Sequence, residues 1–233
     1  MLWLSLAAGV VVLGLIYGFL RHCEAASPSD WGDPWHNRLV GCITLFCRKY
    51  HGLDPQLRLP LPERGCALVA ANHVSGLDPL LLLASSPRPL RFLIAREQYE
   101  RFGLTWIFRS GGCIPVDRGR RPERAMREAM RALEEGEVVA VFPHGTIHLE
   151  TDPPRKLKGG VVRLAQKSGC PIYPVRLDGI RGQGHTLLAL PIPSRARLTL
   201  LAPLRLAPDD DYAASLRALT ALLERREGDH GRL

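Results

Sequence analysis

The chain has 233 residues and a formal net charge of +8, from 31 Lys plus Arg against 23 Asp plus Glu. Its 46% hydrophobic and 23% charged residues are typical of a globular protein and exclude an intrinsically disordered one. No segment of about 20–50 residues repeats, which excludes solenoids and propellers. Positive charge suits nucleic acid, but the chain holds no nucleic-acid-binding motif, so no nucleic-acid partner is expected.

The first twenty residues, Met1–Leu20, contain no charged side chain. As a helix they would rise about 30 Å, the thickness of the hydrocarbon core of a bilayer. Trp3 and Tyr17 lie near the two ends, where aromatic side chains favour the membrane interface. A cleaved signal peptide would carry Lys or Arg before its apolar run, and none is present. We therefore predict a retained membrane anchor over residues 1–20.

The segment after this anchor is basic, with Arg21, Arg38, Arg48 and Lys49. Because Lys and Arg are enriched on the cytoplasmic side of membrane helices, we expect an inner-membrane or plasma-membrane protein whose body lies in the cytoplasm.

A second helix is predicted over residues 34–50, because Asp33 is a good N-cap and Pro34 suits the first helical position. Apolar residues then recur on one face of that helix, at Trp35, Leu39, Cys42, Ile43, Phe46 and Tyr50. This face could pack on the core of the protein or lie among lipid headgroups. Its position directly after the anchor is why we assign residues 34–50 as an amphipathic interfacial helix, followed by one domain over residues 60–233.

From Cys66 onward, short apolar runs alternate with helical patterns. The predicted strands are Cys66–Ala71, Leu90–Ala95, Cys113–Val116, Glu137–Phe142, Pro171–Arg176 and Arg197–Leu201. The predicted helices cover residues 77–85, 98–109, 121–135, 156–168 and 209–226. This alternation predicts an α/β fold, with a mostly parallel sheet covered by helices. No glycine-rich nucleotide motif follows any strand, so no cofactor is expected.

The six cysteines lie at positions 23, 42, 47, 66, 113 and 170. Their even number is compatible with disulfides. Most lie within apolar runs, however, where cysteine behaves as a small hydrophobic residue. We therefore expect reduced, buried thiols, as in a cytoplasmic domain, and core packing for Cys113 and Cys170 instead of nucleophilic catalysis.

A candidate catalytic pair follows the first predicted strand, where His73 stands in a turn five residues before Asp78. The carboxylate could fix the tautomer of the imidazole while the other ring nitrogen takes a proton from a hydroxyl. A histidine with a purely structural role in the turn is the alternative. Two later stretches, Gly111–Arg118 and Val141–Thr146, also place polar groups at the carboxyl ends of predicted strands, where ligands bind in open α/β sheets.

Four motifs in order make this pattern specific. They are Asn72-His73-x4-Asp78-Pro79, Gly112-x-Ile114-x-Val116-Asp117-Arg118, Phe142-Pro143-x-Gly145-Thr146 and Pro171-Ile172-Tyr173-Pro174-Val175, with Lys158-Gly159-Gly160 before the last. Together they resemble the glycerolipid acyltransferase family, of the 1-acylglycerol-3-phosphate (lysophosphatidate) acyltransferase type. The N-terminal anchor and the helix that follows it also resemble the membrane-docking pair of bacterial members.

The resemblance implies a membrane-bound enzyme of phospholipid synthesis that transfers a fatty acyl group from acyl-CoA or acyl carrier protein to a lysolipid hydroxyl. His73 would be the general base and Asp78 its orienting partner, with no acyl-enzyme and no metal. The other residues assigned to the substrate site are Asn72, Arg118, His144, Gly145, Thr146 and Lys158. Of these, Arg118 and Lys158 would supply positive charge for a phosphate, and the backbone around Gly145 is a candidate oxyanion donor.

The third motif departs from the family pattern Phe-Pro-Glu-Gly-Thr-Arg, because His144 replaces the glutamate and Ile147 the arginine. In the family these two residues help to hold the glycerol phosphate of the acceptor. Lysophosphatidate is still the expected acceptor, with another lysophospholipid, a lyso-aminolipid or a non-catalytic lipid-binding role as alternatives. A zinc site of His73, His144 and His148 is not expected, because the last two would align only on a helix and glycine lies between them.

Overall fold

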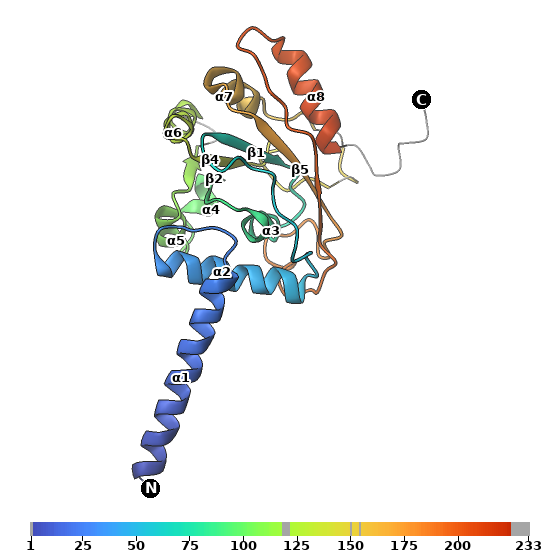
Figure 1. Cartoon of the computed structure of the whole chain (residues 1–233). Coiled ribbons are helices and arrows are strands. Elements are labelled where there is room, and N and C mark those ends of the chain that lie inside the picture. Colours follow the sequence, from blue (N-terminus) through green and yellow to red (C-terminus); the bar gives the residue numbers. More distant parts are fainter. Residues whose placement is uncertain (1, 118–121, 150, 154, 225–233) are drawn as a thin grey trace.

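The computed structural model describes residues 2–117, 122–149, 151–153 and 155–224. Its centre is a six-stranded sheet with the order β3-β2-β4-β1-β5-β6 (Figure 1). The strands are β1 (Ala67–Ala71), β2 (Leu90–Ala95), β3 (Ile114–Val116), β4 (Val138–Val141), β5 (Ile172–Asp178) and β6 (Arg197–Leu200). Neighbouring strands are parallel except β5 and β6, which are antiparallel. The predicted α/β class and mostly parallel sheet are confirmed.

Helices cover both faces of this sheet, which explains why all five residues of β1 are buried. Alternate residues of β1 belong to different cores, with Val69 in one and Leu68 in the other. The first core includes residues of α2 (Pro34–Tyr50) and α3 (Asp78–Ser85). The second includes residues of α6 (Pro122–Glu134), α7 (Gly160–Ser168) and α8 (Tyr212–Glu224).

Two helices differ most from their predicted bounds. The helix predicted over residues 98–109 is two short helices, α4 (Arg96–Tyr99) and α5 (Thr105–Ser110). Gly103 lies between them with a φ of +80°, a left-handed conformation that ends a right-handed helix. The helix predicted from residue 156 begins only at Gly160, after the Lys158-Gly159 step.

The N-terminal helix α1 (Leu2–Ala26) projects away from the rest of the molecule (Figure 1). Its segment Ser5–Ala26 is long and apolar enough to cross a membrane, and little of it is buried. Close packing joins it to α2, because a Cβ on Gly41 would lie 1.6 Å from the carbonyl oxygen of Cys23. Only glycine allows the two helices to meet at this distance.

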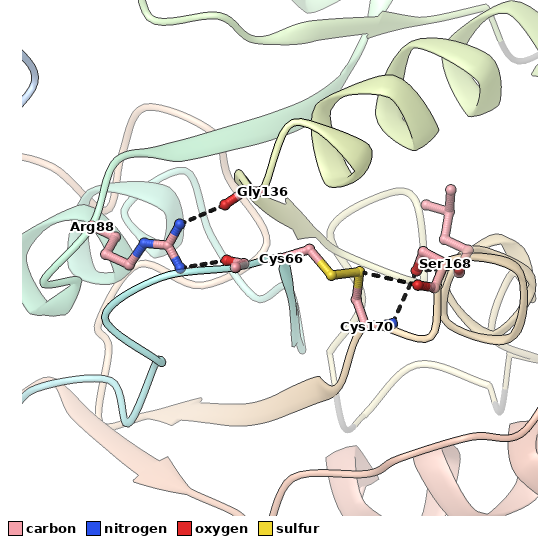
Figure 2. Close-up of a disulfide and its surroundings, with 7 residues drawn as sticks. Cys66, Arg88, Gly136, Ser168 and Cys170 are labelled. Carbon is pink, nitrogen blue, oxygen red and sulfur yellow. Dashed lines mark hydrogen bonds between the residues drawn. A yellow bond between two sulfur atoms is a disulfide. The ribbon is translucent and has the colours of Figure 1, made fainter.

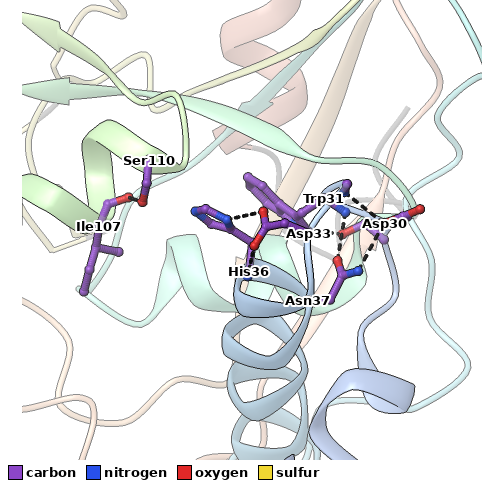
Figure 3. A network of polar contacts seen from close by, with 9 residues as sticks. Asp30, Trp31, Asp33, His36, Asn37, Ile107 and Ser110 are labelled. Carbon is purple, nitrogen blue, oxygen red and sulfur yellow. Dashed lines mark hydrogen bonds and ion pairs between the residues drawn. The ribbon is translucent and has the colours of Figure 1, made fainter. Parts of the chain in front are cut away.

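Helix α2 has the predicted bounds, and Asp33 caps it by accepting a hydrogen bond from the backbone N–H of His36 at 3.0 Å (Figure 3). Its buried residues are Val40, Gly41, Thr44 and Cys47. Of the six apolar positions predicted to share one face, Trp35, Cys42 and Tyr50 are exposed and the other three are half-buried. Helix α2 therefore packs on α1 and α3 through a face displaced from the predicted one.

A disulfide joins Cys66 to Cys170, with 5.5 Å between their Cα atoms (Figure 2). The expectation that all six cysteines are reduced is therefore wrong. Each of the two stands just before a strand, and β1 and β5 are parallel neighbours that pair Leu68 with Ile172. Two residues earlier in both strands, the cysteines lie opposite each other. The sequence placed both in apolar runs but did not reveal that their strands are adjacent.

The remaining cysteines, at 23, 42, 47 and 113, are free thiols. Burial raises the pKa of the Cys47 thiol to about 12 and that of Cys113 to about 11. Because the thiolate is the reactive form, neither residue is set up as a nucleophile, and the interpretation of Cys113 as a core residue agrees with this environment.

Candidate functional site

The centre of the site is the turn between β1 and α3. His73 follows the end of β1, and its Nδ1 lies 2.8 Å from Oδ2 of Asp78. Asp78 is the first residue of α3 and is completely buried, whereas the His73 side chain keeps a fifth of its surface exposed. The structure thus brings the predicted pair together, with the carboxylate inside and the imidazole reaching the surface.

Asp78 is held by three further donors from the same turn. The backbone N–H groups of Val74 and Ser75 donate to its Oδ2 at 2.6 and 2.9 Å, and the Ser75 hydroxyl donates to Oδ1 at 2.8 Å. The Ser75 hydroxyl in turn accepts from the N–H of Leu77 at 3.2 Å. Such bonds satisfy a buried carboxylate and fix its orientation. The His73 ring is consequently oriented by a rigid partner.

The third motif, which follows β4, lies against the other side of the imidazole. The Phe142 ring stacks on the His73 ring with centroids 4.3 Å apart. The Gly145 N–H donates to the Phe142 carbonyl at 2.9 Å, and Gly145 has a φ of +75°. That N–H is therefore used within the turn. His148 closes the contact by donating its backbone N–H to the His73 carbonyl at 2.7 Å.

His144 is buried in this motif and has no hydrogen-bond partner within the described part of the chain. Its ring stacks on that of His148, with centroids 4.8 Å apart, and its Nε2 lies 3.6 Å from a carboxylate oxygen of Glu224 in α8. Burial, and secondarily the nearby His148, lowers the pKa of His144. At neutral pH this ring is an uncharged group where the family pattern places a carboxylate.

Two basic side chains lie near the same turn. A Cβ on Gly145 would lie 2.6 Å from Nζ of Lys158, so the ammonium rests directly against this glycine. The backbone N–H of Lys158 donates to the Pro143 carbonyl at 2.8 Å, which fixes the segment that carries it. Arg155 donates to the Thr146 hydroxyl at 2.5 Å. Lys158 and Arg155 are exposed and can meet an anion there.

Asn72 lies at the end of β1, but its amide faces β5. The amide nitrogen donates to the Leu177 carbonyl at 2.9 Å, and the amide oxygen accepts from the Leu177 N–H at 2.7 Å. The side chain thus continues the pairing of the two strands beyond the last residue of β1. Arg118, the other residue predicted from the first two motifs, lies outside the described residues.

An apolar cavity of about 540 Å³ lies beside this site, between the sheet and helices α6 and α7. Phe142, whose ring stacks on His73, is part of its wall, and Gly145 and Lys158 line it as well. The rest of the wall combines apolar side chains with the charged residues Glu123, Arg127, Arg163 and Lys167. The apolar ones include Leu93, Val116, Met126, Met130, Val141, Val161 and Leu164. Cavities of this kind take ligands that are largely apolar with a few polar groups at one end.

Comparison with known proteins agrees with this geometry. The family model described as Acyltransferase matches residues 52–178, which include both halves of the His73–Asp78 pair and the turn that carries Gly145. This chain belongs to the acyltransferase family.

Several relatives carry names from this family. An N-acylphosphatidylethanolamine synthase of Arabidopsis thaliana is 32% identical over 174 residues, which are 66% of this chain and 61% of the relative. A 1-acyl-sn-glycerol-3-phosphate acyltransferase of Bacillus subtilis is 27% identical over 120 residues, 51% of this chain and 59% of the relative. The chain therefore spans about three fifths of the length of these relatives.

The fold of this acyltransferase-family chain also has a solved counterpart. The crystal structure of the 1-acyl-sn-glycerophosphate acyltransferase PlsC from Thermotoga maritima matches with a TM-score of 0.61 and 20% sequence identity. The match covers 91% of this chain and 86% of the other. At this identity the likeness concerns the fold.

Sequence reasoning missed three parts of the site in this family member. Ser75 binds Asp78 through both its N–H and its hydroxyl, and its position within the first motif could have indicated this. Glu224 approaches His144 from the far end of the sequence, and no local pattern predicts that contact. The loop after β5 packs on the turn that carries His73 and Asp78, because a Cβ on Gly76 would lie 1.8 Å from the Thr186 carbonyl oxygen.

Proposed function

We propose that this protein is a membrane-bound O-acyltransferase that moves a fatty acyl group from a thioester, acyl-CoA or acyl carrier protein, to the hydroxyl of a lysoglycerolipid. Lysophosphatidate is the expected acceptor, and phosphatidate would be the product. The observation that carries the proposal is the His73–Asp78 pair at the carboxyl end of β1, beside an apolar cavity. The family membership and the names of the relatives support the same reaction class.

In the proposed reaction, the neutral His73 ring carries its proton on Nδ1, and this N–H donates a hydrogen bond to the Asp78 carboxylate. The unprotonated Nε2 is therefore free to act as the base. As the acceptor oxygen attacks the thioester carbonyl carbon, Nε2 takes the hydroxyl proton. The tetrahedral intermediate collapses with loss of the thiolate, which receives that proton from the imidazolium. Asp78 stabilises the imidazolium between the two steps, since its carboxylate is already held by the turn.

In the proposal, the cavity and the basic residues bind different parts of the substrate. The apolar wall between α6 and α7 suits an acyl chain, whereas the ammonium of Lys158 at its edge suits a phosphate. We assign Arg118, Thr146 and Arg155 to the same anionic group. Asn72 acts by holding β1 against β5, and so positions His73 without touching substrate.

A different acceptor is the second candidate, and two observations favour it. His144 is buried and uncharged where the family pattern has glutamate, and Ile147 stands in place of the arginine. One relative is named as a synthase of N-acylphosphatidylethanolamine. A lipid with a larger or amine-bearing headgroup, such as a lyso-aminolipid, would need neither of the two missing charges.

Membrane association is part of the proposal. Helix α1 leaves apolar side chains such as Leu13, Leu15 and Phe19 more than half exposed, and water around so many apolar groups is unfavourable. We place α1 in a bilayer and the catalytic body in the cytoplasm, in agreement with the basic residues after α1.

The test is transfer of a labelled acyl group by the full chain in phospholipid vesicles, with acyl-CoA and acyl carrier protein as donors. The acceptor panel would hold lysophosphatidate, other lysophospholipids, a lyso-aminolipid and phosphatidylethanolamine. We expect product with lysophosphatidate, and a loss of about 10²–10⁴-fold in His73→Ala, as for removal of a general base. His185→Ala, an exposed histidine, is the matched control and should retain wild-type turnover.

Each outcome decides between the candidates. Product on another acceptor alone would select the second candidate and assign the change to His144 and Ile147. Full turnover in His73→Ala would remove His73 from the mechanism. Folded wild-type protein that yields no product on any acceptor would indicate a lipid-binding relative without catalysis.

A further inference from the structure

Four exposed apolar side chains belong to the amino end of α2 and to the α4–α5 segment next to it. They are Trp35 of α2 together with Phe102, Leu104 and Trp106 of the α4–α5 segment. We call them the aromatic patch. Phe102 is fully exposed, Trp35 and Trp106 are each 52% exposed, and the two tryptophan rings lie 5.6 Å apart. Large aromatic groups in contact with each other and with solvent mark an interaction surface.

The α4–α5 segment is held at the surface and contributes little to the core. Neither α4 nor α5 has a buried residue, and every residue from Glu100 to Trp106 is exposed. It stays in place through neighbours near α2. Figure 3 shows Ile107 and Ser110 of α5 across from His36, and a Cβ on Gly111 would lie 3.9 Å from the Trp31 ring. An apolar segment fixed outside the core needs a partner of its own.

We infer that the partner of this patch is the bilayer surface into which α1 inserts. The patch lies at the same end of the molecule from which α1 projects, with α5 beside the amino end of α2 (Figure 1). The surface is thus continuous with the apolar helix across the short connection from Ala26 to Pro34. This inference rests on the membrane association in the proposed function and adds a second contact to it.

The side chains of the patch match the chemistry of a membrane interface. Trp is enriched at the headgroup level, where its ring is partly in the acyl region and its N–H stays hydrated. Phe102 and Leu104 are purely apolar and suit the acyl boundary. Arg101 and Arg109 flank the patch and are exposed, so they can meet anionic lipid phosphates. A soluble protein partner would not account for the neighbouring apolar helix.

The contact would also set the orientation of the site. Helix α4 begins directly after β2, whose last residue, Ala95, lines the apolar cavity. With α1 alone in the bilayer, the catalytic body could tilt relative to the lipid surface together with α1, on which α2 is packed. A second contact through Phe102 and Trp106 limits that tilt and holds the face of the sheet that α2 and α3 cover toward the lipid surface, from which the acceptors come.

The test uses full-length variants that keep one tryptophan each, with Phe at the other three natural positions. Trp3 reports on α1, Trp106 on the patch, and a chain without natural Trp that carries Ala218→Trp reports on an exposed position of α8. Each variant would be reconstituted into vesicles of phosphatidylcholine and phosphatidylglycerol, with and without bromine atoms on the acyl chains. Circular dichroism would verify that every variant is folded.

We expect brominated lipid to quench Trp3 and Trp106 but not the Trp at 218, and aqueous iodide to show the reverse. Quenching of Trp3 alone, with Trp106 open to iodide, would overturn the patch contact and leave membrane association standing. Trp106 shielded from both quenchers, with crosslinked dimers, would assign the patch to a second copy of the chain. Lack of quenching at Trp3 would contradict the membrane association itself.

Discussion

At the scale of single residues, Asp78 does more for this protein than orient a histidine. Its two oxygens accept from His73, the N–H groups of Val74 and Ser75, and the Ser75 hydroxyl, all within a buried turn. Removal of the carboxylate would leave several of these donors unsatisfied, and each costs about 1–3 kcal/mol when buried. In the proposed mechanism, catalysis and folding therefore depend on the same group.

We expect Asp78→Ala to lower both the acyl-transfer rate and the melting temperature, whereas His73→Ala lowers the rate alone. The reason is that the His73 ring is partly exposed, and its removal deprives only one side chain, Asp78, of a hydrogen bond. Removal of the Asp78 carboxylate deprives four donors of their acceptor. Thermal unfolding followed by circular dichroism, beside the transfer assay, measures both. Equal melting temperatures for the two variants would show that the turn does not need the carboxylate.

His144 makes stability depend on pH. Burial lowers its pKa from the usual 6.5, so the folded protein holds this ring neutral where the unfolded chain would protonate it. As pH falls below about 6.5 the unfolded state binds more protons, and the free energy of unfolding decreases. The free energy of unfolding continues to decrease until the pH falls below the lower pKa that His144 has in the folded protein.

The corresponding prediction is that the melting temperature decreases between pH 7 and pH 5, and less steeply in His144→Gln. His185→Gln, at an exposed position, is the control variant and should keep the wild-type slope. Differential scanning calorimetry across this pH range tests both variants. Parallel curves for wild type and His144→Gln would mean that another group, such as the buried His51, causes the decrease.

At the scale of elements, the strands were predictable and their neighbours were not. All six predicted strands match observed ones to within two residues, because continuous apolar runs are typical of strands buried on both faces. The order of the sheet is set by packing between distant segments, so the pairing of Cys66 with Cys170 could not be read from spacing. The same holds for Glu224 beside His144.

Local patterns were also insufficient where tertiary contacts override them. The periodicity over residues 98–109 predicted one helix, but the left-handed Gly103 divides it. In α2 the buried face is determined by the approach of α1 at Gly41, which a pattern of apolar residues alone does not record. The contact between His73 and Asp78 was predictable because the two residues lie in one short turn.

We expect the disulfide to stabilise the fold without changing the rate of acyl transfer. It links strands at a separation of 104 residues, and constraining the unfolded chain over such a distance contributes about 2–4 kcal/mol. We expect the double variant Cys66→Ser, Cys170→Ser to unfold at lower denaturant concentration while keeping its transfer rate. A Cys42→Ser variant, at an exposed free thiol, is the control. If reductant leaves the unfolding midpoint of the wild type unchanged, the bond makes no contribution.

At the scale of the whole molecule, the chain is a catalytic α/β body with an apolar helix extending from it (Figure 1). The crossing of α1 and α2 at Cys23 and Gly41 lies beyond residue 20, so removal of the first twenty residues leaves that contact intact. The exposed apolar positions before it are the ones that a bilayer would cover.

We therefore expect a chain lacking residues 1–20 to fold but to be recovered from membranes in a smaller fraction than the full chain. Sedimentation of membranes from expressing cells, with circular dichroism of the purified variant, measures both properties. Complete recovery of the shortened chain with membranes would make α2 and the aromatic patch the principal anchor.

Strands β1 and β5 are joined at both ends of their shared hydrogen-bonded ladder by contacts outside the ladder itself. Cys66 and Cys170 are bonded covalently before the first paired residues (Figure 2). After the last residue of β1, the Asn72 amide makes two hydrogen bonds to the backbone of Leu177. Neither strand can shift along the other without breaking the disulfide or the hydrogen bonds of Asn72. The position of His73 along the strand direction is therefore fixed relative to the loop that follows β5. That loop packs on the turn that carries His73. Under an applied force, or in slow hydrogen exchange, this strand pair should be the last part of the sheet to yield.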